Sequence, residues 1–336
     1  MATRRPVIKD VAALAGVSWK TVSNVMNDRP VVKPETRQRV LDAVATLGYT
    51  PNHAGRDLRE GRSRSVALVL PELENPYFAR LAEYAERALA DRGRTLSIEL
   101  TGGDADREAA YLQGATAREF SAVLLSATRV SEQSVVNRPD WTPLVLLGER
   151  VSNVAVPHIA IDNAGATVDL VRHLVAGGRR HIGFIGAPES ALPSTGSVRL
   201  AGFQAAMRFA DLPVANIQRC IDWNREDGYR LMQQMLAVGD PLDAVVCAND
   251  LMAIGAVRAL VESGRRVPDD VALVGFDDIA EAAWCSPPLT TIRPDLELLV
   301  RHALDAALTP DGVRERGSEI VVPHELVVRA SSAPKG

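Results

Sequence analysis

Hydrophobic positions near the N-terminus predict two short helices around a tight turn. Between Ile8 and Asn27, in IKDVAALAGVSWKTVSNVMN, apolar residues recur at helical spacings of three and four on either side of Gly16. Gly16 stands where the chain must turn, because glycine adopts positive φ without a steric penalty. Ser18 follows as a candidate N-cap of the second helix. The pattern therefore predicts a helix–turn–helix.

The second of these helices has one apolar and one polar face. Val22, Val25 and Met26 form its predicted buried face. The opposite face carries hydrogen-bonding side chains and no carboxylate, as expected of a helix that reads base edges in the DNA major groove. An αα-hairpin that only packs on another element is the alternative. The exposed candidates are Trp19, Lys20, Ser23, Asn24 and Asn27.

A third helix is predicted from Glu35 to Leu47, with Val40, Leu41 and Val44 on the face that closes a small core. Gly48 follows as a helix-terminating residue. Residues 1–50 therefore form a small, all-helical head.

The pattern changes character from Ser65 onward. Apolar runs of four to seven residues alternate with amphipathic helices, which predicts parallel sheets covered on both faces. More than eight such runs are too many for one open sheet, so we expect an α/β fold with two doubly wound lobes and ligands at the strand ends. The predicted strands are SVALVLP, TLSIEL, SAVLLSA, PLVLLGE, HIAID, HIGFIG, CIDW, AVVCAND and VALVGFDD.

The segment between head and body is basic and contains one large apolar residue, Leu58. Leu58 could be inserted between base steps in the minor groove, with arginines on the flanking phosphates. A flexible linker whose leucine packs on the body is an equally good interpretation of this segment alone. Its arginines are Arg56, Arg59, Arg62 and Arg64.

Charge is distributed unevenly along the 336 residues. Residues 1–62 carry 11 Lys and Arg and 6 Asp and Glu, a net charge of +5, whereas the remainder carries −9. A basic head on an acidic body is expected when only the head meets phosphate.

Other classes of protein find little support in the composition. There is no apolar run long enough to span a membrane and no signal-peptide pattern, so we expect a cytoplasmic protein. The three cysteines, which are distant from one another, indicate reduced core residues and neither disulfides nor a zinc site. Phosphate-binding and catalytic motifs are missing, so we expect no enzyme, no cofactor and no metal. The three cysteines are Cys220, Cys247 and Cys285.

His158 could pair with Asp162, although local capping is the simpler role.

Polar residues collect where the predicted strands end. Carboxylates, amides, an arginine and one tryptophan form a hydrogen-bonding set with a stacking surface, suited to a sugar or another polyol. Many such residues are only N-caps of the next helix, as Asn163, Asp250 or Ser197 could be. Asp277 and Trp223 are harder to explain in this way, because neither clearly begins a long helix.

With these residues assembled, the sequence resembles transcriptional regulators of the LacI/GalR (lactose-repressor-like) family over nearly all of residues 7–330. The resemblance implies a head in 1–50, a hinge helix in 51–62, and a periplasmic-binding-protein-like effector domain in 63–336. Lobe one would comprise about 63–162 and 293–322, and lobe two about 163–292 and 323–330. The motifs that carry it include IKDVAALAGVSWKTVSNVMN, IDNAGA, HLVAGGRRHIGFIG, RLAGF, CANDLMAIGAVRALVESGRRVPDDVALVGFDDI and PPLTTIRPD.

The resemblance also implies roles for particular residues. Trp19, Lys20 and Asn24 would read bases, and Leu58 would be the minor-groove wedge. Arg199, in RLAGF, would clasp the effector. The complete implied effector set is Asn75, Tyr77, Arg199, Trp223, Asn249 and Asp277.

Four features depart from the family pattern. Asn24 stands where arginine is usual, Gly55 and Asp57 weaken the hinge helix, and Pro294 stands where glutamine is frequent. The chain also ends without a heptad tail, so we expect a homodimer and not a tetramer.

The sequence therefore favours a repressor that binds operator DNA and whose DNA affinity a small ligand controls. A solute-binding receptor of a transporter is the alternative, since the body alone has that architecture, and an enzyme is a third. A sugar is the favoured effector because of Trp223 and the Asp and Asn set, while stacking by Tyr77 leaves a purine open.

Overall fold

The computed structural model describes residues 6–26, 29–49, 63–113, 116–139, 142–148, 156–190, 193–309 and 319–334. Its contacts divide the chain into two compact units, residues 1–63 and 64–336. The two units are described separately below.

The N-terminal unit is a three-helix head built on a small valine and alanine core. Its helices are α1 (Ile8–Ala15), α2 (Trp19–Met26) and α3 (Pro34–Leu47). Val11, Val22 and Val40 are completely buried at its centre. The predicted buried face of the third helix is wrong at Leu41, which is 42% exposed, because the core is closed by Val40 and Ala43 instead.

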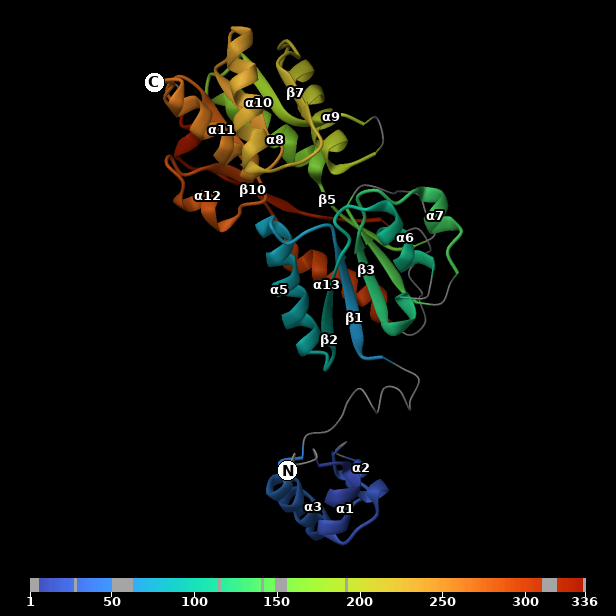
Figure 1. The fold of residues 1–336 in the computed structure, drawn as a ribbon. Coiled ribbons are helices and arrows are strands. Elements are labelled where there is room, and N and C mark those ends of the chain that lie inside the picture. Colours follow the sequence, from blue (N-terminus) through green and yellow to red (C-terminus); the bar gives the residue numbers. More distant parts are fainter. Residues whose placement is uncertain are drawn as a thin grey trace. The chain divides into compact units, whose positions relative to one another are not determined.

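The second unit contains two six-stranded sheets, each the centre of one lobe (Figure 1). The lobe-one sheet has the strand order β11-β5-β4-β3-β1-β2, and its neighbouring strands are parallel. Its strands are β1 (Ser65–Leu70), β2 (Thr95–Leu100), β3 (Ala122–Ser126), β4 (Leu144–Leu147), β5 (His158–Ile161) and β11 (Glu319–Val322), and its helices are α5 (Pro76–Ala90), α6 (Ala105–Gln113), α7 (Glu132–Val136) and α13 (Leu296–Leu308).

The lobe-two sheet has the order β12-β10-β9-β8-β6-β7, with one antiparallel pair, β10 and β12, at its edge. Its strands are β6 (Ile182–Pro188), β7 (Ile217–Cys220), β8 (Ala244–Cys247), β9 (Ala272–Phe276), β10 (Thr290–Pro294) and β12 (His324–Val327). Its helices are α8 (Asn163–Ala176), α9 (Thr195–Phe209), α10 (Arg225–Val238), α11 (Asp250–Glu262) and α12 (Ala280–Trp284).

The chain crosses between the lobes three times. It passes from β5 to α8 at Asp162, from β10 to α13 at Asp295, and from β11 to β12 at Pro323. Asp162 ends the first crossing by capping α8, since its Oδ1 accepts the main-chain N–H of Gly165 at 2.9 Å. The second crossing lies two or three residues later than expected, because β10 continues to Pro294 before leaving lobe two.

Most predicted strands have their counterparts in the structure. One prediction is wrong in position: only the first residue of CIDW lies in a strand, because β7 ends at Cys220 and the next three residues lie in the following loop. The strands β10, β11 and β12 were not predicted. Their sequences mix apolar residues with Thr, Arg, Glu and Pro, so they lack the continuous apolar run of a central parallel strand.

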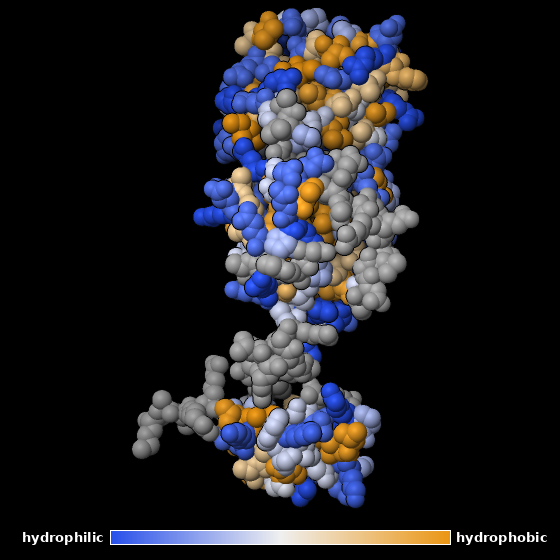
Figure 2. Space-filling model, turned by 90° about the vertical axis from the view of Figure 1, so that its right-hand side faces the viewer, coloured by the Kyte–Doolittle hydropathy of each residue, from blue (hydrophilic) through white to orange (hydrophobic). Residues whose placement is uncertain are grey.

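Hydrophobic side chains fill both faces of the two sheets, and some also reach the surface. On the face drawn in Figure 2, hydrophobic residues of lobe two are interspersed with hydrophilic ones.

Across the described parts of the chain, no helix combines the length and apolar character needed to cross a membrane.

A buried carboxylate fixes the loop that follows β3. Glu108, on α6, is completely buried. One of its oxygens accepts the main-chain N–H of Thr128 at 2.9 Å, and the other accepts those of Arg129 and Val130 at 2.8 and 2.7 Å. Because each carboxylate oxygen is matched to N–H donors, an isosteric amide would point its own N–H at another donor.

We therefore expect Glu108→Gln to lower the free energy of unfolding by about 1–3 kcal/mol. Urea unfolding followed by circular dichroism measures the change. Glu119→Gln, at an exposed position in the same lobe, is the control and should leave the midpoint unchanged. Equal midpoints for both variants would show that the Glu108 contacts contribute little.

Candidate DNA-binding helix and effector site

The helix–turn–helix of the head is closed by local hydrogen bonds. Gly16 adopts φ +64°, the left-handed conformation predicted for it, and ends α1. Two residues later, Ser18 Oγ accepts the main-chain N–H of Thr21 at 3.1 Å, so Ser18 caps α2 as predicted. These contacts fix where α2 begins and thus which of its faces is exposed.

The two faces of α2 differ as the sequence pattern indicated. Val22 is completely buried and Val25 is 3% exposed, whereas Trp19 is 52% exposed and Lys20 is exposed. Ser23 and Asn24 lie between these extremes, half-buried along the edge of the helix. An exposed indole, an ammonium group and two short polar side chains thus share one side of a helix. The other predicted DNA-contacting residues, Asn27, Arg56, Leu58 and Arg59, lie outside the described residues.

The candidate effector site is centred on the guanidinium of Arg199, which is 3% exposed. Its Nε donates to Asn163 Oδ1 at 2.7 Å, and its Nη1 donates to the main-chain oxygen of Ala248. Its Nη2 lies 3.6 Å from Asp277 Oδ1. The guanidinium carbon also lies 3.4 Å from the centroid of the Phe276 ring, a close cation–π contact.

Asp277 supplies the negative charge of this site. It follows β9 directly and adopts φ +107°, a conformation rare for a residue with a side chain. Burial raises the pKa of its carboxyl group to about 6, and the neighbouring Arg199 guanidinium offsets this rise only in part. The carboxylate of Asp277 is therefore ionised at neutral pH but close to its titration range.

Trp223 provides a flat apolar surface beside the arginine. Its ring lies 5.3 Å from the guanidinium carbon of Arg199, and its Nε1 donates to the main-chain oxygen of Gly186 at 3.1 Å. A Cβ at Gly196 would come within 2.9 Å of the indole, so the missing side chain makes room for the ring. Gly186, at φ +103°, likewise leaves no space for a side chain beside Ala248.

The remaining predicted effector residues are engaged in local structure. Asn75 caps α5 by accepting the N–H of Tyr77 at 3.0 Å, and the Tyr77 ring packs edge-on against Phe78. Asn249 caps α11 through Met252 and donates its amide to the main-chain oxygen of Trp223 at 3.0 Å. Both polar atoms of the Asn249 side chain are thus used, and this residue acts by holding the tryptophan loop.

A cavity of about 280 Å³ lies between the lobes beside their second and third crossings. Of the predicted effector residues, Asp277 lines it and the other five do not. Both lobes contribute to its wall, which consists of Arg80, Tyr84, Asp277, Arg293, Pro294, Asp295, Leu296, Glu297, Pro323, His324 and Glu325.

Sequence reasoning missed several residues of this site. Asn163, considered only as a helix cap, instead binds Arg199, while Asp162 caps α8. Asp250, also considered a cap, accepts Thr291 Oγ1 at 2.6 Å and the N–H of Ile279 at 3.0 Å. The available signal for these residues was their position next to a predicted strand end, but that position does not distinguish a helix cap from a partner of a distant side chain.

The suggested pairing of His158 with Asp162 is wrong. His158 instead binds the main-chain oxygen of Gly148.

The raised pKa of Asp277 predicts a particular pH dependence of stability. An unfolded aspartate titrates near pH 3.9, so between about pH 4 and 6 the folded protein holds a proton that the unfolded chain has lost. The free energy of unfolding should therefore fall as pH rises through this interval, by up to about 1.4 kcal/mol per pH unit, and then level off.

Urea unfolding from pH 4 to 7 measures this effect as the difference between wild type and Asp277→Asn. That difference should decline up to pH 6, whereas the difference from Asp269→Asn, an exposed position, should show no such decline. Absence of a decline in the Asp277→Asn difference would contradict the raised pKa.

Comparison with known proteins agrees with this architecture. Residues 7–52 match the model of bacterial regulatory proteins of the lacI family, and residues 171–332 match the periplasmic binding protein-like domain. The chain is 33% identical to the HTH-type transcriptional repressor PurR of Mannheimia succiniciproducens, covering 96% of this chain and 98% of that protein. It is 34% identical to the protein of the same name from Klebsiella pneumoniae, over 97% and 96% of the two chains.

Solved structures give the same result. The lac repressor dimer bound to operator and the anti-inducer ONPF superimposes with a TM-score of 0.85 and 27% identity, over 98% of this chain and 100% of that chain. The complex of the transcriptional regulator CelR with cellobiose superimposes with a TM-score of 0.70 and 31% identity, over 97% and 100%. This chain therefore belongs to the lacI family of bacterial regulatory proteins, and it is a DNA-binding transcriptional regulator.

Proposed function

We propose that this regulator is a repressor that binds a palindromic operator as a homodimer and responds to a sugar bound between its lobes. In this proposal residues 1–50 are the DNA-binding domain, 51–62 the hinge, and 63–336 the domain for effector binding and dimerisation. The observation that carries the proposal is the α2 helix, whose valines pack inward and whose Trp19 and Lys20 face outward.

The head would place α2 in the major groove, with Trp19, Lys20, Ser23, Asn24 and Asn27 facing the bases. Leu58 would enter the minor groove between base steps, while Arg56 and Arg59 bind the flanking phosphates. Each chain carries one such head, so a dimer would read two half-sites arranged as a palindrome.

Exposed hydrophobic side chains of the second unit support a dimer. Ile98 and Leu100 are 42% and 47% exposed on β2, the edge strand of the lobe-one sheet. In lobe two, Ile221 is 68% and Trp284 is 88% exposed. Ile98 and Leu100 are two positions apart and therefore share one face of the edge strand, and adjacent exposed apolar side chains mark a surface that another chain can cover.

A sugar is supported by the chemistry of the candidate effector site. Hydroxyl groups of a sugar bind carboxylate and guanidinium groups, and the apolar face of its ring stacks on an aromatic side chain. Asp277, Arg199 and Trp223 provide these three elements within one site. The relative that is solved as a complex with cellobiose also points to a sugar.

Asn24 provides a direct test of DNA reading. An asparagine side chain complements adenine N7 and N6, whereas an arginine complements the two acceptors of guanine. Asn24→Arg should therefore shift the preference at one position of each half-site from A·T toward G·C, by about 1–3 kcal/mol of discrimination.

Selection from a random DNA pool with both proteins measures this preference. The operators that wild type selects should be palindromic, and their affinity should fall steeply with salt, because binding displaces counterions. Identical sequence preferences would assign Asn24 to a phosphate contact. Failure of wild type to select any sequence would contradict the proposed function.

Trp223 provides the test of the effector site. Thermal melting with a panel of monosaccharides, disaccharides including cellobiose, and nucleobases should identify sugars that raise the melting temperature. Trp223→Ala should weaken the binding of an identified sugar at least about tenfold, equivalent to about 1.4 kcal/mol. Trp223→Phe, which keeps an aromatic face, should retain most of the affinity.

Phe209→Ala is the control, because this aromatic residue is 92% exposed at the end of α9. It should respond to the panel as wild type does. Stabilisation by nucleobases alone would replace the sugar with a base as the effector, and full sugar affinity in Trp223→Ala would exclude Trp223 from the site.

A further inference from the structure

Two consecutive aspartates join the candidate effector site to the contact between the lobes. Asp277 and Asp278 have φ angles of +107° and +48°, both in the region that side chains rarely adopt. Such a turn persists only where its surroundings hold it. The first aspartate faces Arg199 in the candidate effector site.

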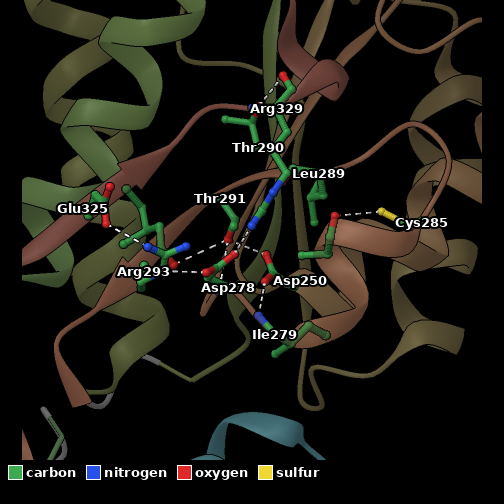
Figure 3. A network of polar contacts seen from close by, with 12 residues as sticks. Asp250, Asp278, Ile279, Cys285, Leu289, Thr290, Thr291, Arg293, Glu325 and Arg329 are labelled. Atoms are coloured by element: carbon green, nitrogen blue, oxygen red, sulfur yellow. Dashed lines mark hydrogen bonds and ion pairs between the residues drawn. The ribbon is translucent and has the colours of Figure 1, made fainter. Parts of the chain in front are cut away.

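On the lobe-two side, the turn is held by a network of side chains (Figure 3). The carboxylate of Asp278 accepts Arg293 Nε at 2.6 Å and Arg329 Nη2 at 2.7 Å. Asp250 holds the end of the turn by accepting the N–H of Ile279. Arg293 lies on β10, and it also binds Glu325 of β12 at 2.9 Å. β10 leads directly into the second crossing between the lobes, and β12 begins directly after the third.

On the lobe-one side, the turn is met by Arg80 of α5. Arg80 Nη1 donates to the main-chain oxygen of Asp278 at 3.1 Å. This arginine also lines the cavity between the lobes, together with Asp277. One peptide unit therefore separates the carboxylate that would meet the effector from the carbonyl that lobe one binds.

We propose that Arg80 is a positioning residue that couples the effector site to the arrangement of the lobes. An effector that engages Asp277 acts on a turn in which two successive residues have sparsely populated backbone conformations, so a shift at Asp277 is passed to Asp278. The carbonyl of Asp278 then turns, and its hydrogen bond with Arg80 is broken or remade. The Arg80 contact thereby biases the equilibrium between two lobe arrangements, a population shift. This inference rests on the proposed effector site.

The test uses the full-length protein without any ligand. Arg80→Ala should increase amide hydrogen exchange at residues 277–279 while leaving α11 unchanged. It should also change the affinity for the selected operator by at least about fivefold, the lower end of ordinary allosteric coupling. Arg80→Lys, which keeps a cationic donor, should restore both measurements to near wild type.

Arg87→Ala is the matched control, since Arg87 lies two turns further along α5, where it stacks on Tyr84 and donates to the main-chain oxygen of Glu83. Exchange and affinity equal to wild type in Arg80→Ala would overturn the proposal, as would faster exchange without a change in affinity. If wild type binds no operator, the proposed function fails, and unchanged exchange in Arg80→Ala then still overturns the Arg80 contact.

Discussion

The burial of one positive charge organises the centre of the effector domain. A guanidinium removed from water is costly unless hydrogen-bond acceptors and an opposite charge surround it. Arg199 meets this requirement with Asn163 from the first crossing, the main chain of Ala248 after β8, and Asp277 after β9. Segments from three distant parts of the sequence are therefore held together at the carboxyl ends of the lobe-two strands.

The same constraint explains how Asp277 differs from an ordinary surface aspartate. Burial favours its neutral form, the guanidinium favours its ionised form, and burial is the larger effect. A ligand that replaces one of these partners changes that balance at once. The charge pair is thus a structural element of lobe two, and its carboxylate lines the cavity between the lobes.

Local sequence patterns predicted a large part of this structure, for reasons that the structure makes clear. Gly16, Ser18 and Val22 identify the helix–turn–helix because turn, cap and core depend on neighbouring residues. Continuous apolar runs likewise identify the central strands of both sheets. The β10 and β12 strands escaped prediction because they connect lobes, so their polar residues bind side chains that are remote in sequence. Asn163 and Arg80 were missed for the same reason, since each acts on a residue at least 36 positions away.

The three crossings at Asp162, Asp295 and Pro323 have a consequence for the way such a protein can be rebuilt. Each lobe is assembled from separate stretches of chain, so no single stretch of the gene encodes a lobe. A lobe of a relative therefore cannot be transplanted by exchanging one stretch of sequence. A single exchanged stretch would divide the strands of the sheets between the two relatives. The N-terminal unit, residues 1–63, is continuous in sequence and can be exchanged as one block. Recombination among relatives would thus readily yield new pairings of operator with effector, but only rarely new pairings of one lobe with another.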